Sequence, residues 1–88
     1  MSHIVDFTEM DKLRKMLDKE GIEWHDNTVY NEDMILARTQ GDGFSVICGD
    51  GSFGGYHGLL EVWTVIMDDP EGYCTAEECM DYILDVTK

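Results

Sequence analysis

The sequence predicts an α+β fold in which a small antiparallel β-sheet of three to four strands is flanked by an N-terminal and a C-terminal helix, in the order α-β-β-β-α. Apolar residues recur at helical spacing near both ends of the 88-residue chain, whereas the middle alternates as strands do. The predicted strands have short connections, so they should pair antiparallel, because a parallel crossover needs a dozen residues or more. Residues 1–88 are expected to form one domain around one core.

The first helix is expected to have Thr8 as its N-cap and Gly21 as its C-terminal stop. Its apolar side is formed by Met10, Leu13, Met16 and Leu17. Its polar side carries four of the six basic residues of the chain: Lys12, Arg14, Lys15 and Lys19.

The second helix is marked by a capping box, in which Thr75 is the cap and Glu78 reaches back from the third helical position. Pro70 and Gly72 precede it and prevent an earlier start. Its apolar stripe consists of Ala76, Cys79, Met80, Ile83 and Leu84.

Strands are predicted over residues 44–48, 59–67 and 34–39, with a weaker fourth candidate at 22–25, and residues 27–33 read as a loop. Within 44–48, one face carries Phe44, Val46 and Cys48. The 59–67 segment is apolar on both faces, which is typical of a central strand covered on both sides. One face is expected to carry Leu60, Val62 and Ile66. The other is expected to carry Leu59, Trp63, Val65 and Met67.

The chain is strongly acidic, with 19 acids against 6 bases and a net charge of −13. From Glu20 to Val86 there are 15 acids and one base, Arg38. Binding to nucleic acid or to an anionic membrane is excluded on this balance, because each phosphate contact needs a cation. A protein with a basic surface is the expected partner. The sequence shows no signal peptide and no apolar run that could span a bilayer, so a cytoplasmic location is expected.

The segment GDGSFGG, residues 49–55, matches the G-x-G-x-x-G pattern of nucleotide-binding loops. A dinucleotide-binding turn must open a helix, but a strand-like run follows this segment. The lysine of an ATPase phosphate loop and the other kinase motifs are missing, and Asp50 would repel phosphates. The segment is therefore interpreted as a hairpin connection.

Metal and catalytic chemistry find little support in the sequence. The spacing of Cys48, Cys74 and Cys79 suits no zinc site, so these cysteines are expected to be free thiols buried as small hydrophobic residues. A calcium-loop pattern can be aligned so that it begins at Met67. It fails because the first position of such a loop is normally an aspartate. The sequence thus predicts no metal, no cofactor and no enzymatic activity.

Aromatic side chains around the glycine-rich connection form the candidate binding surface, since Trp and Tyr often dominate the energy of protein recognition. The predicted partner-binding residues are Asp50, Phe53, Tyr56, His57, Glu61 and Trp63. The alternative is that Phe53 and Tyr56 fold back over the sheet edge as a minor core.

Three segments, LRKMLDKEGIEWHD, GLLEVW and EGYCTAEECMDYI, resemble small acidic accessory proteins encoded by phages and prophages of gut bacteria. The resemblance implies a non-enzymatic inhibitor acting in the bacterial host cell. Its target would be a basic, nucleic-acid-handling defence protein, as for anti-CRISPR proteins or DNA mimics. The alternative is a homodimeric structural or assembly protein without inhibitory activity.

Overall fold

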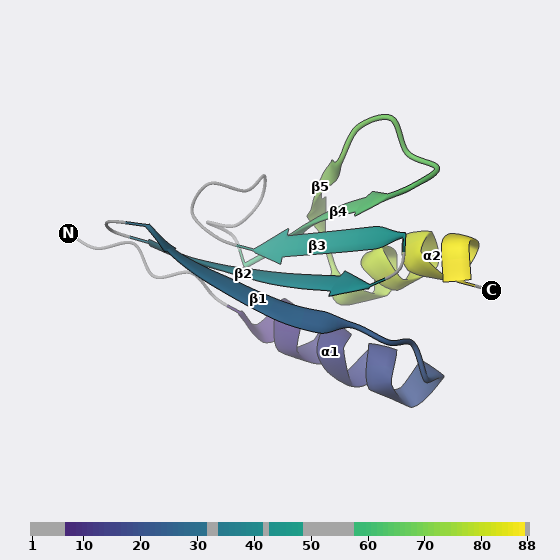
Figure 1. Cartoon of the computed structure of the whole chain (residues 1–88), viewed down its shortest axis with the longest axis horizontal. Coiled ribbons are helices and arrows are strands. Elements are labelled where there is room, and N and C mark those ends of the chain that lie inside the picture. Colours follow the sequence, from purple (N-terminus) through teal and green to yellow (C-terminus); the bar gives the residue numbers. More distant parts are fainter. Residues whose placement is uncertain (1–6, 32–33, 42, 49–57, 88) are drawn as a thin grey trace.

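The computed structural model describes residues 7–31, 34–41, 43–48 and 58–87, which form a five-stranded sheet and two helices (Figure 1). In chain order the elements are α1 (Thr8–Glu20), β1 (His25–Asn31), β2 (Met34–Gly41), β3 (Phe44–Cys48), β4 (Leu60–Thr64), β5 (Glu71–Cys74) and α2 (Ala76–Thr87). The strands lie in the order β1-β2-β3-β4-β5, and each pairs antiparallel with its neighbour. The predicted α+β class with a helix at each end is confirmed, but the sheet has five strands rather than three to four.

The first additional strand lies where a loop was predicted. β1 pairs with β2 along its whole length, from His25 opposite Gln40 to Asn31 opposite Met34. It overlaps residues 27–33, and the weak candidate at 22–25 reaches it only at His25. Asn and Asp are poor strand formers, but β-propensity is weak and depends on the neighbouring strand. The partner strand therefore decides the conformation here.

The second additional strand, β5, is short and irregular. Leu60 pairs with Cys74 and Val62 pairs with Glu71, so β5 has one extra residue opposite Glu61. Tyr73 lies within this bulge and has a φ of 58°, which is uncommon for an aromatic residue. A bulged edge strand is a poor template for pairing with another chain.

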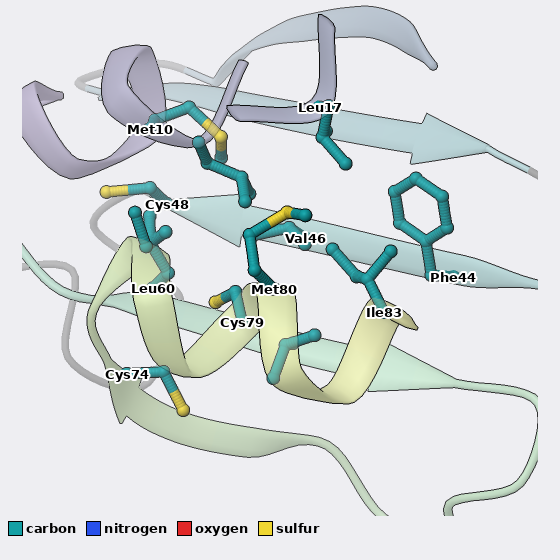
Figure 2. Packing of buried hydrophobic residues seen from close by; sticks show 13 residues of the cluster. Met10, Leu17, Phe44, Val46, Cys48, Leu60, Cys74, Cys79, Met80 and Ile83 are labelled. Carbon is teal, nitrogen blue, oxygen red and sulfur yellow. The ribbon is translucent and has the colours of Figure 1, made fainter. Parts of the chain in front are cut away.

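Both helices contribute to the same hydrophobic core on one face of the sheet (Figure 2). Helix α1 supplies Met10, Leu13 and Leu17, β3 supplies Phe44, Val46 and Cys48, β4 supplies Leu60 and Val62, and α2 supplies Ala76, Cys79, Met80 and Ile83. The predicted inward faces of the two helices and of β3 are thereby confirmed.

The prediction for residues 59–67 is wrong in two respects. The strand stops at Thr64, because a turn begins at Val65, and Ile66 is 69% exposed rather than aligned with Leu60 and Val62. Thr64 takes the place on the core side and is fully buried. Trp63, on the other side of the strand, is 36% exposed, and neither described helix packs on that side of β4.

The helix ends follow local sequence signals closely. Gly21 has a φ of 71°, and the Ile22 N–H donates to the Leu17 carbonyl at 2.9 Å, which closes α1. The capping box is confirmed, since the Thr75 N–H donates to Glu78 Oε1 at 3.0 Å and the Glu78 N–H donates to Thr75 Oγ1 at 3.3 Å. The N-cap of α1 is Phe7, one residue before the predicted Thr8.

The N-terminal ends of the two helices are joined by side chains from α1. Glu9 Oε1 accepts a hydrogen bond of 2.8 Å from the backbone N–H of Ala76, at the first turn of α2. Lys12 forms an ion pair with Glu77, the residue after Ala76 on α2, and this pairing lowers the pKa of Glu77. Glu9 thus places a carboxylate at the positive end of the α2 dipole, far from it in sequence.

Replacing Glu9 with alanine is expected to lower the free energy of unfolding by about 1 kcal/mol, because a first-turn N–H of α2 loses its acceptor. Glu9→Gln should retain more of the stability, since its amide oxygen can still accept. Urea titrations followed by circular dichroism measure both changes, with Asp69→Ala in the exposed 65–70 connection as the control. If Glu9→Ala unfolds at the wild-type urea concentration, this contact contributes nothing to stability.

Candidate functional site

The face of the sheet opposite the two helices carries a shallow depression with a volume of about 190 Å³. It is lined by Ser45, Ile47, Glu61, Trp63 and Pro70, which we call the open-face patch. Ser45 pairs with Trp63 and Ile47 pairs with Glu61, so β3 and β4 place these four side chains next to one another. Successive strand residues point to opposite faces, and the helices cover the face of Val46 and Val62. Neither of the two described helices therefore lies over the patch.

The chain that follows the patch residue Trp63 carries exposed apolar and acidic side chains. After Trp63 the chain continues into Val65 and Ile66, which are 60% and 69% exposed, on a connection that projects from the body of the fold (Figure 1). The same connection and the start of β5 carry exposed acids at Asp68, Asp69 and Glu71. Within the patch the Trp63 indole lies beside the Glu61 carboxylate, and the exposed acids Asp69 and Glu71 flank Pro70 in sequence.

The structure brings together two of the six predicted partner-binding residues. Glu61 and Trp63 lie on the same side of β4 as parts of the patch. The other four, Asp50, Phe53, Tyr56 and His57, lie outside the described residues.

Sequence reasoning missed the remaining patch residues. The alternation within residues 44–48 contained the signal for Ser45 and Ile47, because placing Phe44, Val46 and Cys48 inward leaves these two pointing outward. Pro70 carried no such signal, since its place beside Trp63 depends on the β4–β5 connection.

Acids are distributed over several parts of the described surface. One group lies at the end of α1 and just after it: Glu20, Glu23 and Asp26. A second group lies on β4, on the 65–70 connection and at the start of β5: Glu61, Asp68, Asp69 and Glu71. A third group lies on α2: Glu77, Glu78, Asp81 and Asp85. This distribution does not resemble one row of phosphates, so it adds no specific support for DNA mimicry. The cations of α1 are partly used within the fold, as in the Lys12–Glu77 pair.

Arg14 and Trp24 belong to a separate cluster at the junction of α1 and β1. Arg14 donates to Asp26 and to Asp11, both at 2.7 Å, and its guanidinium lies 6.0 Å from the centre of the Trp24 ring. The Trp24 indole N–H donates to Asp18 at 2.8 Å. These contacts give Trp24 a structural role at this junction, on elements outside the open-face patch.

The three cysteines are buried free thiols, as predicted from the sequence. Burial and the nearby charge of Glu78 raise the pKa of Cys74, whose sulfur donates to the Gly72 carbonyl at 3.5 Å. Burial also raises the pKa of Cys79, well above the ordinary range for a thiol. Because the thiolate is the nucleophile, neither cysteine is suited to covalent catalysis. Within the described ranges, no three His, Cys, Asp or Glu side chains gather as a metal site requires.

Native thiols are expected to react with iodoacetamide at pH 8 at least about a hundredfold more slowly than in urea, because reaction requires local or global opening. The raised pKa of Cys79 also gives a pH dependence. Its contribution to stability is intact below the ordinary thiol pKa of about 8.5, and it falls above that pH as the unfolded chain ionises first. Mass spectrometry of labelled peptides measures the rates. Native labelling of Cys79 as fast as in urea would show that its sulfur is accessible.

Neither described helix is long and apolar enough to cross a membrane, since α1 has 13 residues and α2 has 12, against the roughly 20 that a bilayer requires. No family model, curated protein or solved structure matches the chain. Function is therefore inferred from the patch and the chemistry of its residues.

Proposed function

We propose that this chain is a non-enzymatic binding protein that uses the open-face patch to hold a protein with a basic surface. The observation that carries the proposal is the sheet face opposite the two helices, where Ile47, Glu61, Trp63 and Pro70 line one depression. The exposed acids Asp69 and Glu71 flank Pro70 in sequence. Nucleic-acid-handling proteins have such basic surfaces, and an inhibitor of a host defence protein would act by occupying one.

The chemistry of the patch suits protein recognition in two ways. Trp is enriched among the residues that dominate interface energies, and Trp63 presents a large apolar surface on a regular strand. The net charge of −13 would attract a basic partner over several ångströms and speed its association. Salt should weaken this attraction, because exposed charges are screened.

A matched pair of charge reversals tests the proposal. Glu61→Lys and Asp85→Lys change the net charge equally, but only Glu61 lies in the patch. Immobilised protein is used to capture basic proteins from a bacterial lysate at low salt, and the captured protein is then purified and titrated calorimetrically. We expect Glu61→Lys and Trp63→Ala to weaken binding at least about tenfold, as for residues at the centre of an interface, and Asp85→Lys to have little effect. Equal losses for both reversals, or no salt-sensitive partner, would contradict the proposal.

The second candidate function is that of a homodimer that stacks two open-face patches. The observation that favours it is the same apolar surface, since exposed apolar patches also serve self-association. Salt separates the two candidates. Added salt should promote a dimer of two chains of charge −13 by screening their repulsion, whereas it should weaken a complex with a basic protein. Sedimentation equilibrium at low and high salt measures the first effect directly.

A further inference from the structure

The helical side of the molecule has a second recess, separate from the open-face patch. Helices α1 and α2 run in the same direction, since Glu9 and Lys12 meet the start of α2 whereas Glu20 lies near its end. One hollow of about 320 Å³ lies between them, and another of about 380 Å³ lies at their C-terminal ends. Both hollows are lined by Glu20, so they adjoin. We call the two together the interhelix groove.

The groove is apolar where it meets the core. Met16 and Leu84 are half-buried in the hollow between the helices, and Ile22 and Val86 are half-buried at its end. Met80 of α2 also lines the hollow between the helices, and it is only 4% exposed. Methionine has a flexible and polarisable side chain, so a surface with two methionines can adapt its shape to an incoming apolar group.

The rim of the groove is acidic. The lining residues include four acids and one base: Glu20, Glu23, Glu77 and Asp81 against Lys19. Glu77 is paired with Lys12, so it adds little net charge to the rim. The C-terminal ends of both helices add partial negative charge, and α2 has no basic residue in its last turn. The groove therefore favours an occupant that is apolar on one side and cationic at its flanks.

We propose that the interhelix groove binds an amphipathic helix of a partner protein, with an apolar stripe flanked by lysines and arginines. The groove follows α2 from Glu77 to Val86, which is about 14 Å at 1.5 Å per residue, enough for two to three turns of a docked helix. Recognition would follow the helix-in-groove mode, in which apolar residues at i, i+3, i+4 and i+7 enter the groove.

A second copy of this chain cannot supply that helix. Of the two described helices only α1 is basic and amphipathic, and its apolar side chains Met10, Leu13 and Leu17 are fully buried in its own core. Offering them to another molecule would require unfolding. Since α2 is acidic, it would be repelled by the rim of the groove. The occupant must therefore come from a different protein.

The test uses a synthetic 14-residue peptide with leucines at helical spacing and lysines and arginines elsewhere. Two control peptides are a scrambled version and one in which glutamates replace the basic residues. Binding is followed by the methyl signals of ¹³C-methionine-labelled protein. We expect the signals of Met16 and Met80 to shift with a Kd below about 100 μM, while the buried Met10 stays unchanged and neither control binds. Shifts confined to other methionines, equal binding of a control, or no shift at about 1 mM peptide would overturn the proposal.

Two surface variants separate this groove from the open-face patch. Asp81→Lys reverses an exposed rim charge and should weaken the peptide about three- to tenfold, mainly through slower association. Trp63→Ala changes the other face of the sheet and should leave peptide affinity unchanged. If Trp63→Ala weakens the peptide and Asp81→Lys does not, the peptide binds at the patch and the groove proposal fails while the proposed function stands.

Discussion

Leu60→Ala is expected to lower the free energy of unfolding by about 3 to 4 kcal/mol, the largest effect of any substitution considered for this protein. Leu60 is fully buried on β4, and its side chain lies within the cluster that joins β3, β4 and α2 (Figure 2). Truncation removes the favourable burial of its side chain and leaves a cavity that a packed core fills only in part. A chain of 88 residues has a total stability of about 4 to 13 kcal/mol, so this one change could remove most of it.

Urea unfolding of Leu60→Ala, measured by circular dichroism, should show a lower midpoint with an unchanged slope. The neighbouring Leu59 provides a matched control. It is half-buried just before β4, so Leu59→Ala should cost only about 1 kcal/mol. Equal losses for both leucines would mean that β4 does not present Leu60 to the core as described.

Gly41→Ala is expected to have the next largest effect, a loss of about 2 to 3 kcal/mol. A Cβ at this position, the last residue of β2, would lie 2.4 Å from the Glu23 carbonyl oxygen and 2.6 Å from Cε1 of Phe44. These distances are far inside van der Waals contact, and one of the two neighbours is backbone. Relief of the clash would move either the chain entering β1 or the Phe44 ring, which is only 3% exposed.

The control for Gly41 is Gly21, where the constraint is of a different kind. Gly21 has a φ of 71°, and a Cβ there would meet no described atom within 4 Å. Gly21→Ala should therefore lower the free energy of unfolding by only about 1 kcal/mol, the penalty for placing a residue with a Cβ in the left-handed conformation. Thermal and urea unfolding of both variants would show the order. A smaller loss for Gly41→Ala than for Gly21→Ala would contradict the close packing of β2 against Glu23 and Phe44.

Sequence by itself determined the features that depend on a few neighbouring residues. The helix stop at Gly21 and the capping box of Thr75 and Glu78 are set by local backbone preference and by hydrogen bonds across one turn. The inward faces of both helices and of β3 followed from apolar spacing, because a helix or strand has a fixed repeat. The class α+β could be predicted for the same reason. Two residues of the candidate site, Glu61 and Trp63, were also found in advance from their chemistry.

Only the tertiary structure decided which faces are covered and where marginal strands form. β1 exists because it pairs with β2, and β5 exists because it pairs with β4, although the sequence predicts a loop for most of β1 and no strand at β5. The apolar residues of 59–67 could not reveal that both described helices pack on the same face of β4, since the same pattern also suits a strand covered on both sides. The Glu9 cap of α2 joins residues 67 positions apart in sequence, and the interhelix groove likewise joins α1 to the distant α2. Such features depend on long-range packing, which no local pattern encodes, and both proposed binding surfaces are of this kind.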